Sequence, residues 1–288
     1  MTHLKLFIDL TRLKKPIGFM LLFWPCAWGL TLAYDFSLSL NNYFFYLTLF
    51  FLGSVLMRSA GCIVNDILDK EFDAKVFRTK NRPIASGKIS IKVAIFYSLI
   101  LCFLALLVLL NFNFLTIILA LGSMPLAFTY PLMKRFTYWP QLFLGITFNY
   151  GLILGWTAIE GQLDLAPIIF YLGAIFWTLG YDTIYGYQDI RDDEIIGLKS
   201  TSIKFKGKAK KFLIMSYSLL IILFSIGGYF MKFDPKYYFI LFIPFIHLFF
   251  YQIRNLNLKN PTSCLRIFKS NNIFGLIIFL NILIAKNL

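Results

Sequence analysis

Histidine, cysteine and acidic residues are scarce in this chain of 288 residues, which has two His, four Cys and fourteen Asp and Glu together. His3 and His247 are isolated, so neither a histidine-based zinc site nor a nucleophile triad is supported. The cysteines show no paired spacing and are interpreted as small hydrophobic residues. Because carboxylates are so few, the concentration of most of them in two short stretches is informative.

Apolar residues dominate the rest of the sequence, with 59% hydrophobic and 19% aromatic side chains. An apolar run of about 20 residues is long enough to cross a bilayer as a helix. The sequence predicts an all-α polytopic membrane protein with nine such segments, near residues 17–34, 43–64, 91–110, 113–130, 140–158, 166–187, 211–231, 237–252 and 272–286.

Positive charge alternates along the chain with these apolar segments. Nearly all lysines and arginines lie before the first segment or after the second, fourth, sixth and eighth. The positive-inside rule then places the amino terminus and both acidic stretches in the cytoplasm, and it accounts for most of the net charge of +14. We therefore expect a lipid bilayer and no nucleic acid as a partner.

The amino terminus is too polar for a signal-peptide core and is interpreted as a short interfacial helix. It carries an acidic residue and is short for an organellar transit peptide, which favours the inner membrane of a bacterium.

The first acidic stretch runs from Arg58 to Gly87 and reads RSAGCIVNDILDKEFDAKVFRTKNRPIASG. Asn65, Asp69 and Asp73 stand four apart, with Asp66 three before Asp69, so a helix would bring them onto one face. Like charges packed in this way repel, and oxygen-only side chains suit a hard divalent cation such as Mg²⁺. The alternative is a solvated acidic turn at the end of a membrane helix.

The second acidic stretch, from Tyr181 to Phe205, reads YDTIYGYQDIRDDEIIGLKSTSIKF. Asp182, Tyr185, Asp189 and Asp193 again follow helical spacing. Two acidic faces, each ending an apolar segment and each followed by a basic loop, are what a metal-bridged polyanion such as a diphosphate needs.

Basic residues follow both acidic stretches and could neutralise phosphate oxygens. For the lysines at 206–211, contact with lipid headgroups is the simpler interpretation. Arg58 differs from the others because it lies inside the second apolar segment, where an arginine is costly and indicates function. Together with Tyr130, Lys134 and Arg135 it could form a pocket for a small carboxylate or phenol.

Several ordered stretches resemble the signature segments of the UbiA-type intramembrane prenyltransferases, and most closely their 4-hydroxybenzoate polyprenyltransferase branch. They are RLKKPIGFMLLFWP near the start, NDILDKEFD followed by RTKNRPIASG, then YPLMKRFTYWPQLFLG, and finally DTIYGYQDIRDD with GLKSTSIKF. The resemblance covers the chain from about Arg12 to Phe205.

The resemblance implies a single transmembrane domain over residues 1–288, with nine helices around a central cavity. The first motif, 65–73, lies within the first four helices, and the second, 182–193, lies within the last five. The implied metal ligands are Asn65, Asp66, Asp69, Asp73, Asp182, Asp189 and Asp193, of which Asp69, Asp73, Asp189 and Asp193 are catalytic. The implied diphosphate-binding residues are Arg78, Arg82, Lys134, Arg135 and Lys199, and the implied residues of the aromatic pocket are Arg58, Asn65, Tyr130 and Lys134.

The activity implied is Mg²⁺-dependent transfer of a polyprenyl group from polyprenyl diphosphate to the ring carbon ortho to the hydroxyl of 4-hydroxybenzoate, in ubiquinone biosynthesis. Dihydroxynaphthoate, homogentisate or a tetrapyrrole are alternative acceptors within the same superfamily. A cation-coupled transporter would also have many spans and intramembrane acids, but it tends to place them near the bilayer midplane.

Overall fold

A computed structural model describes residues 3–287, and within that range every regular element is a helix. The elements in chain order are α1 (His3–Thr11), α2 (Ile17–Ala33), α3 (Leu40–Leu68), α4 (Lys70–Asp73), α5 (Ile91–Leu109), α6 (Phe114–Gly122), α7 (Met124–Thr129), η1 (Tyr130–Leu132), α8 (Met133–Phe136), α9 (Pro140–Glu160), α10 (Leu165–Gly186), α11 (Ile190–Ile195), α12 (Thr201–Lys204), α13 (Ala209–Phe230), α14 (Pro235–Ile246), η2 (His247–Ile253) and α15 (Pro261–Asn287).

Each of the nine apolar segments expected from the sequence forms a helix or a run of consecutive helices. Eight of them are long and apolar enough to cross a membrane, and Ile17–Ala33 is a shorter apolar helix of 17 residues. The prediction of an all-α, multi-pass membrane protein is therefore confirmed.

Two segments differ from expectation in their bounds. The fourth continues to Phe136 as α6, α7, η1 and α8, with Pro125 and Pro131 in the first turns of α7 and η1, where proline is tolerated. The ninth begins at Pro261 and not near 272, because its first three turns are amphipathic and bury Cys264 and Ile267. Hydropathy alone does not detect such a start.

Helices α2 and α9 pack closely because small residues line their contact. A Cβ added at Gly29 would overlap the backbone of Leu152, and one added at Gly155 would overlap the backbone of Cys26 and Leu30. Without a hydrophobic driving force between helices in lipid, such close approach supplies the packing energy.

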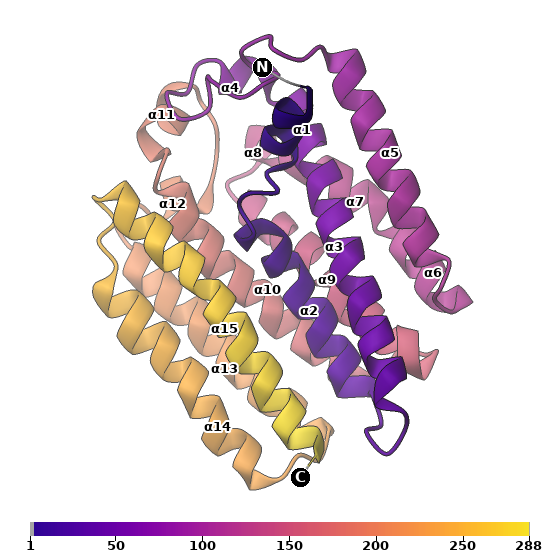
Figure 1. The fold of residues 1–288 in the computed structure, drawn as a ribbon. Helices are drawn as coiled ribbons and strands as arrows, with labels where there is room; N and C mark the ends of the chain where they lie inside the picture. Colours follow the sequence, from indigo (N-terminus) through magenta and orange to yellow (C-terminus); the bar gives the residue numbers. More distant parts are fainter. Residues whose placement is uncertain (1–2, 288) are drawn as a thin grey trace.

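The polar elements gather at one end of the bundle. Figure 1 shows α4 and α11, which belong to the two acidic stretches, at the same end as α1, whereas α15 finishes at the opposite end. The short helix expected at the amino terminus is α1, whose Leu6 and Leu10 pack against Ala60 and Ile63 of α3. The prediction that both acidic motifs share one end is confirmed.

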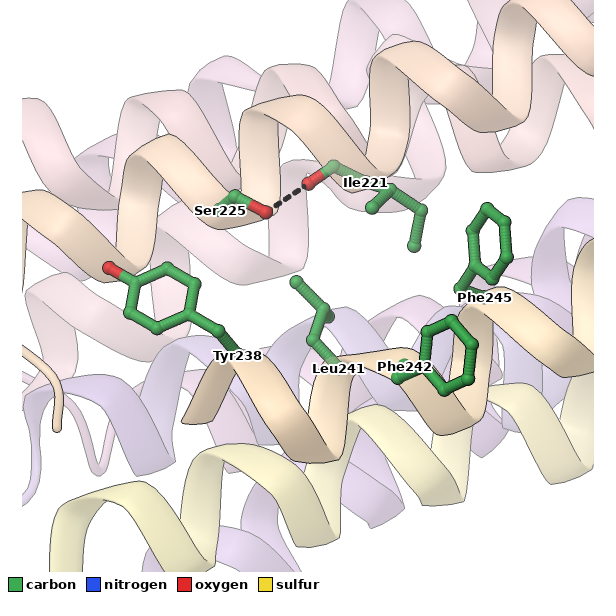
Figure 2. A pocket seen from close by; sticks show the side chains of 6 residues that line it. All are labelled: Ile221, Ser225, Tyr238, Leu241, Phe242 and Phe245. Carbon is green, nitrogen blue, oxygen red and sulfur yellow. Dashed lines mark hydrogen bonds between the residues drawn. The ribbon is translucent and has the colours of Figure 1, made fainter. Parts of the chain in front are cut away.

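A cavity of about 160 Å³ lies between α13 and α14. As Figure 2 shows, aliphatic and aromatic side chains line it, and the Ser225 hydroxyl that borders it donates to the Ile221 carbonyl at 2.8 Å. None of the described residues that line this cavity is charged, so it does not provide the chemistry that the acidic motifs suggest.

Candidate active site at the acidic end of the bundle

The first acidic motif is buried where α3 ends. The Asp69 N–H donates to the Asn65 carbonyl at 2.9 Å and the Asp73 N–H to the Asp69 carbonyl at 2.7 Å, so the helical ladder continues from α3 into α4. Asp66, Asp69 and Asp73 are only 2%, 1% and 7% exposed. This burial contradicts the alternative of a solvated acidic turn.

Cationic side chains from other segments neutralise these carboxylates. Arg82 Nη1 lies 3.1 Å from Asp66 Oδ1 and 2.6 Å from Asp73 Oδ2, and Lys134 Nζ lies 2.5 Å from Asp69 Oδ2. These ion pairs offset the desolvation of the buried carboxylates, because an unpaired buried carboxylate is strongly disfavoured.

The second motif begins in α10 and continues into α11. Asp182 lies on α10, Asp189 is the residue before the first turn of α11, and the Asp193 N–H donates to the Asp189 carbonyl at 2.9 Å. Among the described residues 3–286, no lysine or arginine forms an ion pair with Asp182 or Asp193.

The loop that follows the first motif reaches across to the second motif. Arg78 forms an ion pair with Asp189, and its Nη1 donates to the Tyr185 hydroxyl at 3.2 Å. In the same loop the Phe77 N–H donates to Asp192 Oδ2 at 3.3 Å. The two motifs, far apart in sequence, therefore form the two sides of one site.

Burial also changes the acidity of carboxylates in this site. It raises the pKa of Asp193 to about 6, and the neighbouring charge of Asp189 adds to the effect. Burial likewise raises the pKa of Asp69, although Lys134 opposes the shift. Both groups are easier to protonate than an ordinary aspartate, so both would gain from an added cation.

The donor set fits a hard divalent metal. All of the candidate ligands offer oxygen, and Asp69 Oδ1 is a buried acceptor that receives no hydrogen bond from the residues that the structure describes. Within the described part of the chain, no three Asp, Glu, His or Cys side chains already converge as metal ligands. In this structure Arg78, Arg82 and Lys134 pair with Asp189, Asp73 and Asp69, respectively.

Two residues expected to bind the aromatic substrate, Arg58 and Tyr130, lie beside the ring of Phe148. Arg58 Nε is buried without a hydrogen-bond acceptor, and the guanidinium carbon lies 5.4 Å from the centre of the Phe148 ring. The ring of Tyr130 packs edge-on against the same phenylalanine, with 6.2 Å between centroids. A guanidinium with a buried nitrogen that lacks an acceptor, beside the rings of Tyr130 and Phe148, suits an aromatic anion.

Two of the expected diphosphate-binding residues are less directly placed. Arg135 Nη2 donates to the Leu68 carbonyl at 2.6 Å and lies 3.8 Å from Asp69 Oδ1. Lys199 Nζ donates to the Phe136 carbonyl at 3.2 Å. Arg135 thus borders the first motif, whereas Lys199 is held against α8 and not against a carboxylate.

One charged residue of the site was missed from the sequence. Arg12, in the turn between α1 and α2, places Nη2 2.5 Å from Asp66 Oδ1. The only sequence feature that could have indicated a role for Arg12 was its position at the start of the RLKKP stretch. The residues around Arg12 do not show that this turn contacts α3.

Comparison with known proteins adds independent observations. The model of the UbiA prenyltransferase family matches residues 22–282. The 4-hydroxybenzoate polyprenyltransferase, mitochondrial, of Drosophila pseudoobscura pseudoobscura is 44% identical over 282 residues, which cover 98% of this chain and 70% of that protein. The Homo sapiens protein of the same name is 44% identical over 281 residues, covering 97% of this chain and 75% of the relative.

Solved structures share the fold at lower identity. A UbiA homolog from Archaeoglobus fulgidus bound to GPP and Mg²⁺ has a TM-score of 0.74 at 18% identity, covering 98% of this chain and all of that one (100%). An apo UbiA homolog from Aeropyrum pernix K1 has a TM-score of 0.71 at 22% identity, with 92% and 97% covered. At these identities the likeness establishes the arrangement of helices only.

Proposed function

Because this chain belongs to the UbiA prenyltransferase family, we propose that it transfers a polyprenyl group from polyprenyl diphosphate to 4-hydroxybenzoate, at the ring carbon ortho to the hydroxyl, in ubiquinone biosynthesis. The observation that carries the proposal is the ion pair by which Arg78, in the loop after the buried first motif, joins that motif to the partly buried second motif at one end of the bundle. The names of the relatives at 44% identity support the choice of acceptor.

Mg²⁺ is the proposed cofactor, and the residues that would hold it are Asn65, Asp69, Asp73, Asp189 and Asp193, with Asp66 and Asp182 as accompanying acids. When bound, the metal supplies positive charge that stabilises the diphosphate leaving group. A structural relative whose title names GPP and Mg²⁺ supports this choice.

The basic residues have two successive partners in this proposal. Arg78, Arg82 and Lys134 pair with carboxylates in the structure. If those carboxylates were neutralised by bound Mg²⁺ instead, the same side chains would be free to donate to phosphate oxygens. Arg135 and Lys199 are proposed to add positive charge at the edge of this group.

The acceptor is proposed to lie between Arg58 and Tyr130, with Asn65 and Lys134 on the side of the first motif. Arg58 would bind the carboxylate of the acid, and the rings of Tyr130 and Phe148 would pack against its ring. The ring carbon then attacks the allylic carbon as the bond to the diphosphate breaks, and loss of the ring proton restores aromaticity. Surrounding apolar side chains exclude water from the allylic cation.

We propose that residues 1–288 form one catalytic domain in the inner membrane of a bacterium, with the acidic end facing the cytoplasm. The concentration of lysine and arginine at that end supports this orientation. A cysteine introduced at exposed Lys80 should react with a membrane-impermeant maleimide only in inverted vesicles. A cysteine introduced at exposed Leu163 should react only in intact spheroplasts.

The test supplies membranes containing this protein with 4-hydroxybenzoate and an allylic polyprenyl diphosphate, in the presence of Mg²⁺ or EDTA. We expect 3-polyprenyl-4-hydroxybenzoate only with metal, and its loss in Asp69→Ala and Asp189→Ala. Asp9→Asn, which removes an exposed carboxylate of α1, is the matched control and should retain activity. No product with several tail lengths would exclude this acceptor. Product that survives EDTA and both substitutions would exclude the metal-dependent mechanism.

A further inference from the structure

Asp66 differs from the other acids of the first motif because two guanidinium groups share one of its oxygens. Oδ1 accepts from Arg12 Nη2 at 2.5 Å and from Arg82 Nη1 at 3.1 Å. The carboxylate is 2% exposed, so it interacts with these arginines in a setting where charge pairs are weakly screened.

Arg82 makes a second, shorter contact that leads to the neighbouring acid. The same Nη1 that donates to Asp66 also lies 2.6 Å from Asp73 Oδ2. Arg82 therefore contacts both Asp66, which also pairs with Arg12, and Asp73, which is proposed to bind metal.

The backbone at Arg12 is unusual in a way that fits a specific purpose. Its φ is 57°, in the left-handed region that non-glycine residues seldom adopt and that costs of order 1 kcal/mol or more. The turn is fixed by a hydrogen bond of 2.8 Å from the Lys15 N–H to the Arg12 carbonyl, and α1 before it is anchored by buried Leu6 and Leu10. The fold maintains this conformation, and it directs the guanidinium toward α3.

We propose that Arg12 is a positioning residue for diphosphate binding. Arg12 holds Asp66 in place, and Arg82 keeps its contact with Asp66 while it exchanges Asp73 for a phosphate oxygen. The inference rests on the proposed function for the identity of the phosphate ligand. It assigns Asp66 to the arginines and not to the metal.

Charge explains why Arg12 is needed. Arg12, Arg82 and Asp66 together carry one net positive charge, which favours an incoming phosphate. Without Arg12, Asp66 and Arg82 form a neutral pair that holds Arg82 more tightly and attracts the phosphate less. Loss of Arg12 should therefore weaken diphosphate binding even though Arg12 itself contacts only Asp66.

Binding of magnesium diphosphate to the full-length protein in nanodiscs, measured by calorimetry, tests the proposal without prenyl transfer. Arg12→Gln should weaken binding about tenfold, whereas Arg12→Lys should recover most of the affinity. Arg12→Asn keeps a residue suited to the left-handed backbone, so it should match Arg12→Gln if the contact to Asp66 is what matters. Lys14→Gln removes an exposed charge from the same turn and is the matched control, expected to stay within twofold of wild type.

A double-mutant cycle separates this role from a general effect on charge or folding. Asp66→Asn adds positive charge but removes the carboxylate that positions Arg82, so it should weaken magnesium diphosphate binding about as much as Arg12→Gln if positioning outweighs net charge, and the double variant should be no weaker than either one. Affinity for Mn²⁺ alone should stay within twofold in Asp66→Asn, but it should fall at least tenfold in Asp73→Asn.

Several results would overturn the inference. They are unchanged diphosphate binding in Arg12→Gln, equal weakening in Lys14→Gln, additive losses in the double variant, and a large loss of Mn²⁺ affinity in Asp66→Asn. A wild-type protein that binds magnesium diphosphate but forms no prenylated product would contradict the proposed function alone.

Discussion

Arg78 and Asp189 lie 111 positions apart in the chain, and the Arg78 Nε donates to both carboxylate oxygens of Asp189 at 2.8 Å. Arg78 belongs to the loop after the first motif and Asp189 to the second motif, so this pair joins the two sides of the site. It also places an arginine on a carboxylate that we propose as a metal ligand, where arginine and metal must compete.

Competition between Arg78 and metal for Asp189 predicts that removing Arg78 changes the affinities for metal and for magnesium diphosphate in opposite directions. Arg78→Gln should increase the affinity for Mn²⁺ alone by about threefold to tenfold, because no cation has to be displaced from Asp189. The same variant should weaken binding of magnesium diphosphate, because a phosphate donor is lost. Calorimetry with each ligand checks both signs, and Lys80→Gln in the same loop is the control. A loss of affinity for both ligands would contradict competition.

The pKa of Asp193, raised by burial to about 6, predicts how metal use depends on pH. A carboxylate must lose its proton to bind metal, so protons compete as the pH falls through about 6, and above that value the ligand is fully charged. The Mg²⁺ concentration giving half-maximal activity should therefore rise about tenfold for each pH unit below 6. Activity measured from pH 5 to 8 at several Mg²⁺ concentrations checks this.

Asp192→Asn provides the accompanying variant for that pH profile. The charge of Asp192 contributes to raising the pKa of Asp193, so its removal should move the rise in Mg²⁺ requirement to lower pH. A profile that is unchanged in this variant and flat between pH 5 and 8 in wild type would show that Asp193 does not control metal binding.

The position of Arg58 predicts that its substitution affects KM for one substrate and not for the other. Among the described residues its buried Nε lacks a hydrogen-bond acceptor, its guanidinium lies beside the Phe148 ring, and it forms no ion pair with an acidic motif. Arg58→Gln should raise KM for 4-hydroxybenzoate at least tenfold and leave KM for polyprenyl diphosphate within about threefold. Initial rates at varied concentrations of each substrate check this, and a neutral analogue such as 4-hydroxybenzamide should lose its disadvantage in the variant. Equal increases in both KM values would contradict the assignment.

Close packing between α2 and α9 predicts a large cost for one added methyl group. A Cβ at Gly155 would overlap backbone atoms of α2, so Gly155→Ala should destabilise the protein by about 1–3 kcal/mol. Gly61→Ala is the control, because no heavy atom lies within 4 Å of a Cβ built there and alanine favours a helix by about 1 kcal/mol. Thermal unfolding in detergent should show a lower midpoint only for Gly155→Ala.

Much of the helical framework could be predicted from the sequence, because a bilayer requires long apolar runs and these are visible without tertiary information. The spacing of Asn65, Asp69 and Asp73 also predicted helical succession, and backbone hydrogen bonds four residues apart link them across the junction of α3 and α4. The start of α15 was missed because its first turns mix exposed charged residues, Arg266 and Lys269, with buried polar and apolar ones, which lowers the hydropathy of the segment.

The contacts that assemble the site could not be predicted in the same way. That Arg78 reaches Asp189, that Arg12 reaches Asp66, and that Lys199 is held against Phe136 all depend on how distant segments pack. A local pattern shows which residues carry charge, but it does not show which partner each charge meets.

The arginine and lysine partners of the acidic motifs also bear on how the protein is made. A chain that supplies its own counter-ions to Asp66, Asp69, Asp73 and Asp189 can bury these acids while it is being inserted into the membrane, before any metal arrives. Insertion and folding of the acidic end are therefore expected not to require bound metal.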